Sequence, residues 1–315
     1  MFLYIIKRIL RSFLSLFLII CIVFVLLRQM PIEGYFPSNY DRLTELELNN
    51  ILRNLGLLDP VLVQLFNFLK QLFTEFDFGR SIRYLQGRPV IEIIASKAPI
   101  SFRFGMIAIF FSMPLGMSLG VMMSRKKSGA WDKIGTGYIV LLQAMPAAIY
   151  FVLIQLYGSS LLGLPLLYNP EVPRSLILPI FTMCLPNIAF YALWMRRYMV
   201  DEINKDYIKL ARAKGVPNTT IFFQHVFRNA VVPMTNTIPT AILMTIVGGI
   251  IIESLYSIPG TGGLLVDVIR RQDNPMVQGL VIVYSSLGIL GLLLGDILMA
   301  FVDPRIKLHK KGDQR

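Results

Sequence analysis

Long apolar runs, separated by short polar segments, follow one another along most of this chain of 315 residues. A helix that crosses a membrane needs about 20 apolar residues, and five runs of this kind lie between flanking charges. A sixth run, near the N-terminus, is shorter, but Ile9 and Leu10 extend it, and Arg11 and Arg28 can reach the membrane interface from its ends. The six predicted spans cover residues 12–27, 104–124, 134 to about 157, 175–195, 229–252 and 274–295.

Several prolines lie inside the predicted spans and are expected to bend them. They are Pro114, Pro146, Pro179, Pro186 and Pro239. A polar insertion, residues 31–98, separates the first span from the second. Within it, apolar residues recur at the spacing of one helix face, at Val61, Leu65, Phe68, Leu69 and Leu72. We therefore expect an ordered insertion with at least one amphipathic helix that lies close to the membrane.

The same pattern divides the chain into four parts and predicts an all-α membrane protein. The parts are an N-terminal transmembrane helix at 1–30, the insertion at 31–98, a five-helix core at 99–301 and a tail at 302–315. With six spans, both chain ends lie on the same side of the membrane. A cleaved signal peptide is the alternative for the first span, but it would need small residues after its apolar core, and positions 28–31 read RQMP.

Composition supports a membrane location, because 55% of the residues are hydrophobic, only 16% are charged and the mean hydropathy is +0.61. Lys and Arg near the ends of spans are retained in the cytoplasm. If both chain ends are cytoplasmic, the segments on that side hold 19 of the 31 Lys and Arg but only 7 of the 19 Asp and Glu. Membrane topology therefore explains the net charge of +12, and no nucleic-acid partner is needed.

Residues that bind metals or catalyse reactions are sparse. Cys21 and Cys184 lie inside predicted spans, and His225 and His309 have no partner at ligand spacing. The chain has no GXXXXGK[ST] phosphate loop, no HEXXH and no GXSXG. The stretch PGTGG at 259–263 is interpreted as a turn that uses glycine backbone angles. We expect no metal site, no cofactor and no enzymatic activity in this chain.

The polar segment 201–228 interrupts the apolar core with a predicted helix-turn-helix. Asp206 favours a helix start, and Gly215 suits a left-handed helix end. Between them, an apolar stripe is formed by Tyr207, Leu210 and Ala211. Pro217 suits the first turn of a second short helix, whose apolar residues are Ile221, Phe222, Phe223, Val226 and Phe227. Exposed phenylalanines are unfavourable in water, so we expect them to pack against a partner or against the ends of the spans.

Motifs along nearly the whole chain resemble those of permease subunits of dipeptide and oligopeptide ABC importers. ARAKG at 211–215, followed by His225, Arg228, Asn229 and Pro233, looks like the cytoplasmic coupling motif of that family. Other similar stretches occur in the family's order: LGLLDP at 55–60, DFGRSI at 77–82, MPLG at 113–116, YSIPGTGGLL at 256–265, DNPMVQG at 273–279 and DPR at 303–305.

Two stretches depart from the family pattern. The general coupling motif begins Glu-Ala-Ala, whereas positions 209–211 read KLA, a change that is usual in the peptide subgroup. Positions 30–37 read MPIEGYFP, where peptide permeases commonly show a stretch similar to PGDP. The first departure favours the peptide subgroup, and the second concerns the insertion.

The resemblance implies a type I ABC importer permease fold with six transmembrane helices and a helical extracytoplasmic insertion after the first. It implies a bacterial cell membrane location with both chain ends cytoplasmic. The implied partners are a homologous second permease, two cytoplasmic ATPase subunits that bind ATP and Mg²⁺, an extracytoplasmic substrate-binding protein or lipoprotein, and a peptide substrate. The residues implied in ATPase coupling are Lys209, Ala211, Arg212, Ala213, Lys214, Gly215, Phe222 and Phe223.

Alternatives remain open for the site residues and for the function. The cations of the segment also fit simple anchors at the cytoplasmic face. Arg103, early in the second span, is a candidate contact for a peptide carboxylate, with snorkelling to the interface as its alternative. The leading function is ATP-driven import of short peptides by alternating access. The others are import of nickel or a metal chelate by the same machinery, and a membrane receptor or scaffold that transports nothing.

Overall fold

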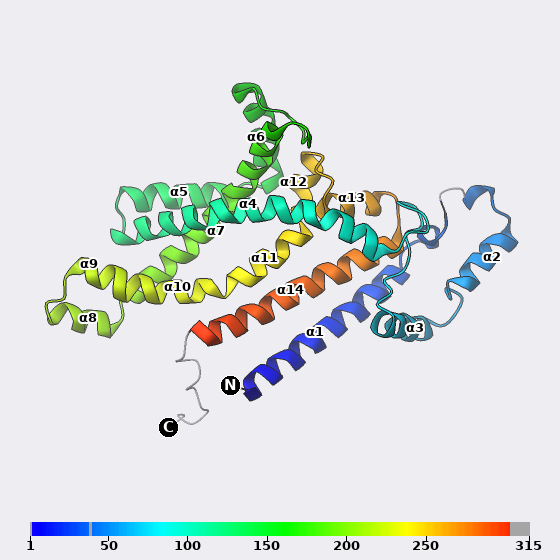
Figure 1. Ribbon diagram of the computed structural model, residues 1–315, viewed down its shortest axis with the longest axis horizontal. Helices are drawn as coiled ribbons and strands as arrows, with labels where there is room; N and C mark the ends of the chain where they lie inside the picture. The colour runs from blue at the N-terminus through cyan, green and yellow to red at the C-terminus, as the bar shows by residue number, and fades with distance from the viewer. Residues whose placement is uncertain (1, 38–39, 303–315) are drawn as a thin grey trace.

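The computed structural model describes residues 2–37 and 40–302, and these residues form helices joined by turns, with one isolated bridge between Arg80 and Pro89. The expected all-α fold class is confirmed. Figure 1 shows the long helices running along the molecule, with α8 (Asp206–Ala213) towards one end and α2 (Glu45–Asn54) towards the other. We call these the α8 end and the α2 end. The predicted tail from residue 303 onwards, with its DPR motif, lies outside the described residues.

Among residues 2–37 and 40–302, five helical segments are long and apolar enough to cross a membrane. Four are the single helices α1 (Phe2–Arg28), α4 (Val90–Arg125), α7 (Ile177–Ile203) and α14 (Asn274–Val302). The fifth, Asn218–Leu255, joins several shorter helices, of which α11 (Thr237–Val247) packs against α14 and α4. Because α4 begins at Val90, the expected boundary between insertion and core at residue 99 falls inside a helix.

The predicted third span is sharply bent. α5 (Ala130–Ala144) and α6 (Ala147–Leu162) meet at 105° across Met145 and Pro146. Proline restricts the residue before it to extended backbone angles, and Met145 has φ −93° and ψ 136°. The bend expected at Pro146 is therefore confirmed, and the bent pair gives six spans if it counts as one crossing.

α4 and α7 approach closely because α4 presents glycines to α7. A Cβ atom at Gly116 would lie 2.7 Å from the carbonyl oxygen of Ile188, and one at Gly120 would lie 2.6 Å from that of Ala192. Both distances are too short for a carbon atom, so glycine is needed for this contact. The two helices thus form a close-packed pair at the centre of the fold.

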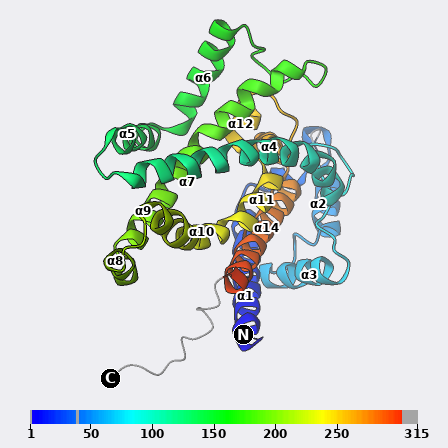
Figure 2. The same ribbon diagram turned by 60° about the vertical axis from the view of Figure 1, so that its left-hand side comes forward.

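The described residues of the insertion, 31–37 and 40–98, include two α-helices and pack against α1. α2 begins with a capping box in which Thr44 and Glu47 exchange hydrogen bonds. α3 (Val61–Thr74) is the expected amphipathic helix, and Phe68 stacks on Phe24 of α1 with ring centroids 5.2 Å apart. Figure 2 shows α3 beside α1, on the side away from α8.

Asp273 joins the insertion to the core through hydrogen bonds. Its fully buried carboxylate accepts hydrogen bonds from the Ser81 hydroxyl at 2.7 Å and from the backbone N–H groups of Arg83 and Tyr84 at 2.9 Å each. A buried carboxylate is tolerated when several donors surround it. The DFGRSI and DNPMVQG motifs therefore meet in space, at the start of α14.

The PGTGG segment surrounds a second buried carboxylate, that of Glu253 in α12 (Ile250–Leu255). Backbone N–H groups of Gly249, Gly262 and Gly263 donate to it at 3.2, 2.8 and 3.2 Å. A side chain at Gly260 would collide with this carboxylate. The interpretation as a turn that uses glycine backbone angles was wrong, because no glycine of this segment has positive φ. Close approach to Glu253 is the physical reason for these glycines.

Two ion pairs join helices near the α8 end. Arg8 of α1 donates from Nε to Asp296 of α14 at 2.5 Å, and Arg196 of α7 donates from Nε to Asp132 of α5 at 2.5 Å. The side chains of Asp296 and Asp132 are only 15% and 7% exposed. Since an unpaired buried charge is costly, these pairs fix which helices are neighbours.

Candidate coupling site at the polar segment

The first arm of the polar segment is α8, and it ends at a glycine as expected. Gly215 has φ +77°, the left-handed conformation that glycine adopts without steric cost. The N–H of Val216 donates to the carbonyl of Ala211 at 3.1 Å, and the N–H of Gly215 donates to that of Arg212 at 2.9 Å. This pair of bonds is a Schellman motif, which closes the helix and sets the direction of the chain after it.

The second arm is longer than expected. Pro217 precedes the helix, with ψ 140°, and so does not lie in its first turn. From there the helix continues through α9 (Asn218–Thr220), the π-helical turn η4 (Ile221–Phe227) and α10 (Arg228–Thr235). The prediction of a second short helix was wrong, because no glycine or proline interrupts residues 218–232. The second arm is the start of the fifth span.

The buried face of α8 also differs from the predicted stripe. Ile208 is fully buried in a cluster with Met195 and Met199 of α7 and with Val226 of η4. Tyr207 and Leu210 are 36% and 56% exposed, whereas Ala211 packs at the edge of this cluster. The apolar stripe that packs inward therefore runs through Ile208 and Ala211. The predicted stripe was wrong at Tyr207 and Leu210 and correct at Ala211.

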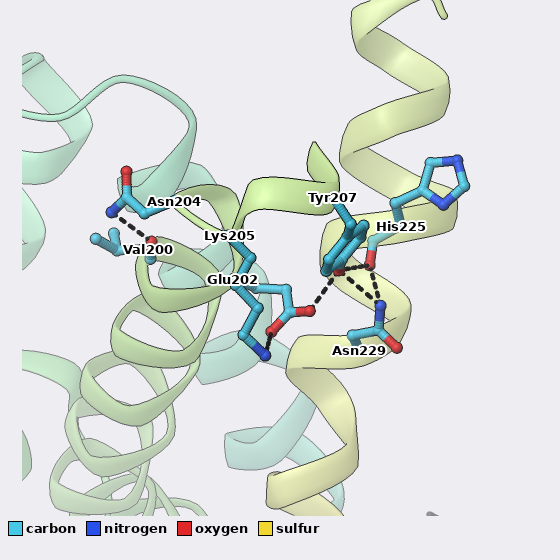
Figure 3. Close-up of polar contacts among 7 residues, drawn as sticks. All are labelled: Val200, Glu202, Asn204, Lys205, Tyr207, His225 and Asn229. Carbon is cyan, nitrogen blue, oxygen red and sulfur yellow. Dashed lines mark hydrogen bonds and ion pairs between the residues drawn. The ribbon is translucent and has the colours of Figure 1, made fainter. Parts of the chain in front are cut away.

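A polar network, which the sequence interpretation missed, joins α8 to both spans. The Tyr207 hydroxyl donates to the buried carboxylate of Glu202 on α7 and accepts from Nδ2 of Asn229 on α10 at 2.9 Å. The same Nδ2 donates to the backbone carbonyl of His225 at 2.8 Å, and Lys205 pairs with Glu202 at 2.6 Å. Figure 3 shows Tyr207 between these partners. The hydrogen bonds to the Glu202 carboxylate are charge-assisted, and such bonds are among the strongest in proteins.

The opposite surface of the segment is basic and exposed. We define the α8 face as Lys209, Arg212, Ala213, Lys214, Gly215 and Phe223, all of which are exposed. Lys209 pairs with Asp206 at 2.8 Å, and its hydrogen bond and positive charge lower the pKa of that carboxyl group. This pair is exposed and adds little to stability, so Lys209 remains available to an acidic partner.

The two predicted phenylalanines have different environments. Phe223 is 54% exposed, while Phe222 is partly buried, with the guanidinium carbon of Arg125 at 5.7 Å from its ring centroid. Both line a cavity of about 710 Å³ between the segment and the adjacent ends of α4 and α7, which also contains Lys127 and Arg212. Six of the eight predicted coupling residues thus share the α8 face beside this cavity, while Phe222 lines the cavity and Ala211 packs inward.

Arg103 is not part of this site. It is exposed, and it lies well inside α4, not near the start of that helix. A second cavity, of about 290 Å³, lies between α4, α7 and α11 and includes Asn187, Tyr191 and Thr245 but not Arg103. Choosing such residues from sequence alone requires the helix orientations, which the apolar runs do not provide. Across residues 2–37 and 40–302, no group of three or more His, Cys, Asp or Glu is placed to hold a metal.

Comparison with known proteins decides the family. Residues 112–308 match the family described as binding-protein-dependent transport system inner membrane component, and residues 1–102 match the N-terminal component of such systems. The chain belongs to this family. Its membership confirms the resemblance that the motifs indicated, and with it the type I permease fold and a multi-pass membrane protein.

Several relatives in this family are peptide permeases by name. The dipeptide transport system permease protein DppB of Bacillus subtilis is 32% identical over 98% of this chain and 99% of its own length. The oligopeptide transport system permease protein OppB of Salmonella typhimurium is 31% identical over 96% of this chain and 99% of its own length. AmiC of Streptococcus pneumoniae, an oligopeptide transport system permease protein, is 37% identical over 66% of this chain, and the match spans 42% of AmiC.

Proposed function

We propose that this chain is the membrane-spanning permease subunit of an ATP-driven importer that passes short peptides from an extracytoplasmic binding protein into the cytoplasm. The observation that carries the proposal is the α8 face, an exposed basic surface joined to α7 and α10 through Tyr207 and the buried Ile208. The names of the relatives, which refer to dipeptide and oligopeptide transport, support the choice of cargo.

The proposed complex contains a homologous second permease, two cytoplasmic ATPase subunits and a substrate-binding protein or lipoprotein. ATP and Mg²⁺ bind to the ATPase subunits, and this chain hydrolyses nothing. The complex lies in a bacterial cell membrane, with both ends of this chain and the α8 end in the cytoplasm. Figure 1 supports this arrangement, because the start of α1, the end of α14 and α8 all lie towards the same end.

In the proposed mechanism, alternating access uses the connections between the α8 face and the spans. When the ATPase subunits close, they move α8, and Tyr207 transmits the movement to α7 through Glu202 and to α10 through Asn229. α4 moves with α7, because the glycines at positions 116 and 120 allow the two helices to pack closely. Packed elements of this kind move as rigid bodies, so the spans open the pathway to each side in turn. The cavity between α4, α7 and α11 is this subunit's proposed share of the pathway.

Peptide import is tested by reconstituting the purified complex, with its own binding protein, in liposomes. Labelled peptides of two to six residues are supplied outside, in parallel with nickel alone and with nickel chelates. We expect peptide uptake that requires ATP and the binding protein. Uptake of a nickel chelate without uptake of peptides would show that the cargo is the chelate. No uptake of any of these compounds, with or without ATP, would support a receptor or scaffold instead.

A further inference from the structure

A cavity of about 390 Å³ at the α2 end lies between the end of α1, α2 and α3. Three basic side chains line it, Arg28, Arg53 and Lys70, against one acidic side chain, Glu75. Its local charge is therefore positive. This cavity lies at the opposite end of the molecule from the α8 face and has no part in the coupling described above.

Two of the lining side chains have polar atoms that are buried without hydrogen-bond partners among the described residues. They are Nε and Nη1 of Arg28 and Oε1 of Gln64. Buried polar atoms normally have partners, and exceptions call for an explanation. The Arg28 guanidinium lies over the rings of Phe24 and Tyr35, at 4.6 and 4.8 Å from their centroids, so its position is fixed. These atoms have almost no accessible surface, so a ligand in the cavity does not touch them, but an anion there would offset the buried positive charge of Arg28.

The faces of α3 place the cavity at the membrane interface. Gln64, Asn67 and Gln71 form a polar stripe that lines the cavity. On the opposite side of the helix, Leu62 and Phe66 are 79% and 68% exposed. A helix with an exposed apolar side and a polar side lies in the plane of the interface, with the apolar side among the acyl chains. The polar stripe is then at the depth of the lipid headgroups.

We infer that this cavity binds the headgroup of an anionic phospholipid of the phosphatidylglycerol type. The phosphodiester accepts hydrogen bonds from the exposed cations Arg53 and Lys70, since guanidinium and ammonium groups are the preferred partners of phosphate, and the charge of Arg28 adds to the attraction. The glycerol hydroxyls lie beside the polar stripe, at Asn67 and Gln71. The acyl chains lie beside the exposed apolar side of α3, and the bound lipid holds the insertion against α1.

Native mass spectrometry of the full-length chain in detergent tests this site without any transport assay. The probes are dioctanoyl phosphatidylglycerol, dioctanoyl phosphatidylcholine and inorganic phosphate. We expect one tight phosphatidylglycerol adduct that binds about tenfold more strongly than phosphatidylcholine and that equimolar phosphate does not displace. Equal binding of the two lipids, or displacement by phosphate, would overturn the proposal.

A pair of double variants locates the site. Arg53→Gln with Lys70→Gln removes two exposed cations from the cavity, and Arg42→Gln with Arg88→Gln removes two exposed cations elsewhere in the insertion. The first pair should weaken the tight adduct about tenfold or more, and the second should leave it unchanged. Equal losses in both would show that the lipid responds to net charge alone, and would overturn a site in this cavity.

Discussion

The side-chain amide of Asn229 donates a hydrogen bond to the phenolic oxygen of Tyr207 at 2.9 Å, and this oxygen also donates to Glu202. One hydroxyl therefore connects α8 with the end of α7 and the start of α10. In this account, it is the joint through which a force on the α8 face reaches two spans.

Tyr207→Phe removes this joint and leaves the ring in place. The buried carboxylate of Glu202 then loses a donor, and the loss of one partner from a buried hydrogen bond costs about 1–3 kcal/mol. We expect faster amide hydrogen exchange in α8 and less peptide uptake per ATP hydrolysed. Tyr157→Phe, at an exposed tyrosine of α6, is the matched control and should change neither. Normal uptake and exchange in the Tyr207 variant would show that the joint is dispensable.

Gly215→Val tests the corner of the segment. An added Cβ at Gly215 meets no atom within 4 Å, so a substitution there acts through the backbone and not through collision. A β-branched residue at φ +77° costs about 1–2 kcal/mol. We expect the variant to reach the membrane but to lose ATPase stimulation by the loaded binding protein. Gly215→Asn should keep most of this stimulation, since asparagine tolerates positive φ, and equal behaviour of the two variants would contradict a conformational role.

Glu253→Gln tests the glycine-lined carboxylate. One carboxylate oxygen accepts from the N–H of Gly249, and the other accepts from those of Gly262 and Gly263. In the variant, the amide NH2 group replaces one of these oxygens and faces the same N–H donors. A buried donor without an acceptor costs about 1–3 kcal/mol, so the thermal unfolding temperature of the purified chain should fall. Glu171→Gln makes the same chemical change at an exposed position and should leave it unchanged. An unchanged unfolding temperature for both would mean that these hydrogen bonds are not stabilising.

The sequence predicted the features that depend on composition over many residues. Apolar runs predicted the spans, and apolar residues at helical spacing around Phe68 predicted α3. Gly215 predicted the left-handed end of α8. It did not predict which side of a helix faces inward, because Tyr207 and Leu210 form as regular a stripe as Ile208 and Ala211. The difference is decided by α7, whose Met195 and Met199 accept Ile208.

The sequence analysis also did not predict the buried carboxylates. Glu253 directly follows a predicted apolar span, and the sequence does not show that backbone N–H groups surround its carboxylate, because such groups carry no residue signature. Asp273 is similar, because its donors come from a segment far away in the chain. In both cases, the glycine-rich or polar motif was visible, but the carboxylate that it surrounds was not.

Membrane orientation is tested by cysteine labelling of intact cells. Asn218→Cys and Asn49→Cys are introduced singly, at exposed positions near the α8 end and the α2 end, into a chain with Cys21 and Cys184 replaced by serine. The charge distribution predicts that a membrane-impermeant maleimide labels position 49 and not position 218. Labelling of position 218 alone would reverse the orientation and remove the α8 face from the cytoplasm.

Contact between the α8 face and an ATPase subunit is the central claim, and site-specific photocrosslinking in the assembled complex measures it most directly. The photoreactive residue benzoylphenylalanine is placed at Ala213, which is exposed at the centre of the α8 face, or at Asn49 of α2 as a control. The account predicts an ATPase adduct from position 213 and none from position 49. An intact complex in which position 213 gives no ATPase adduct, or in which position 49 gives one, would contradict it.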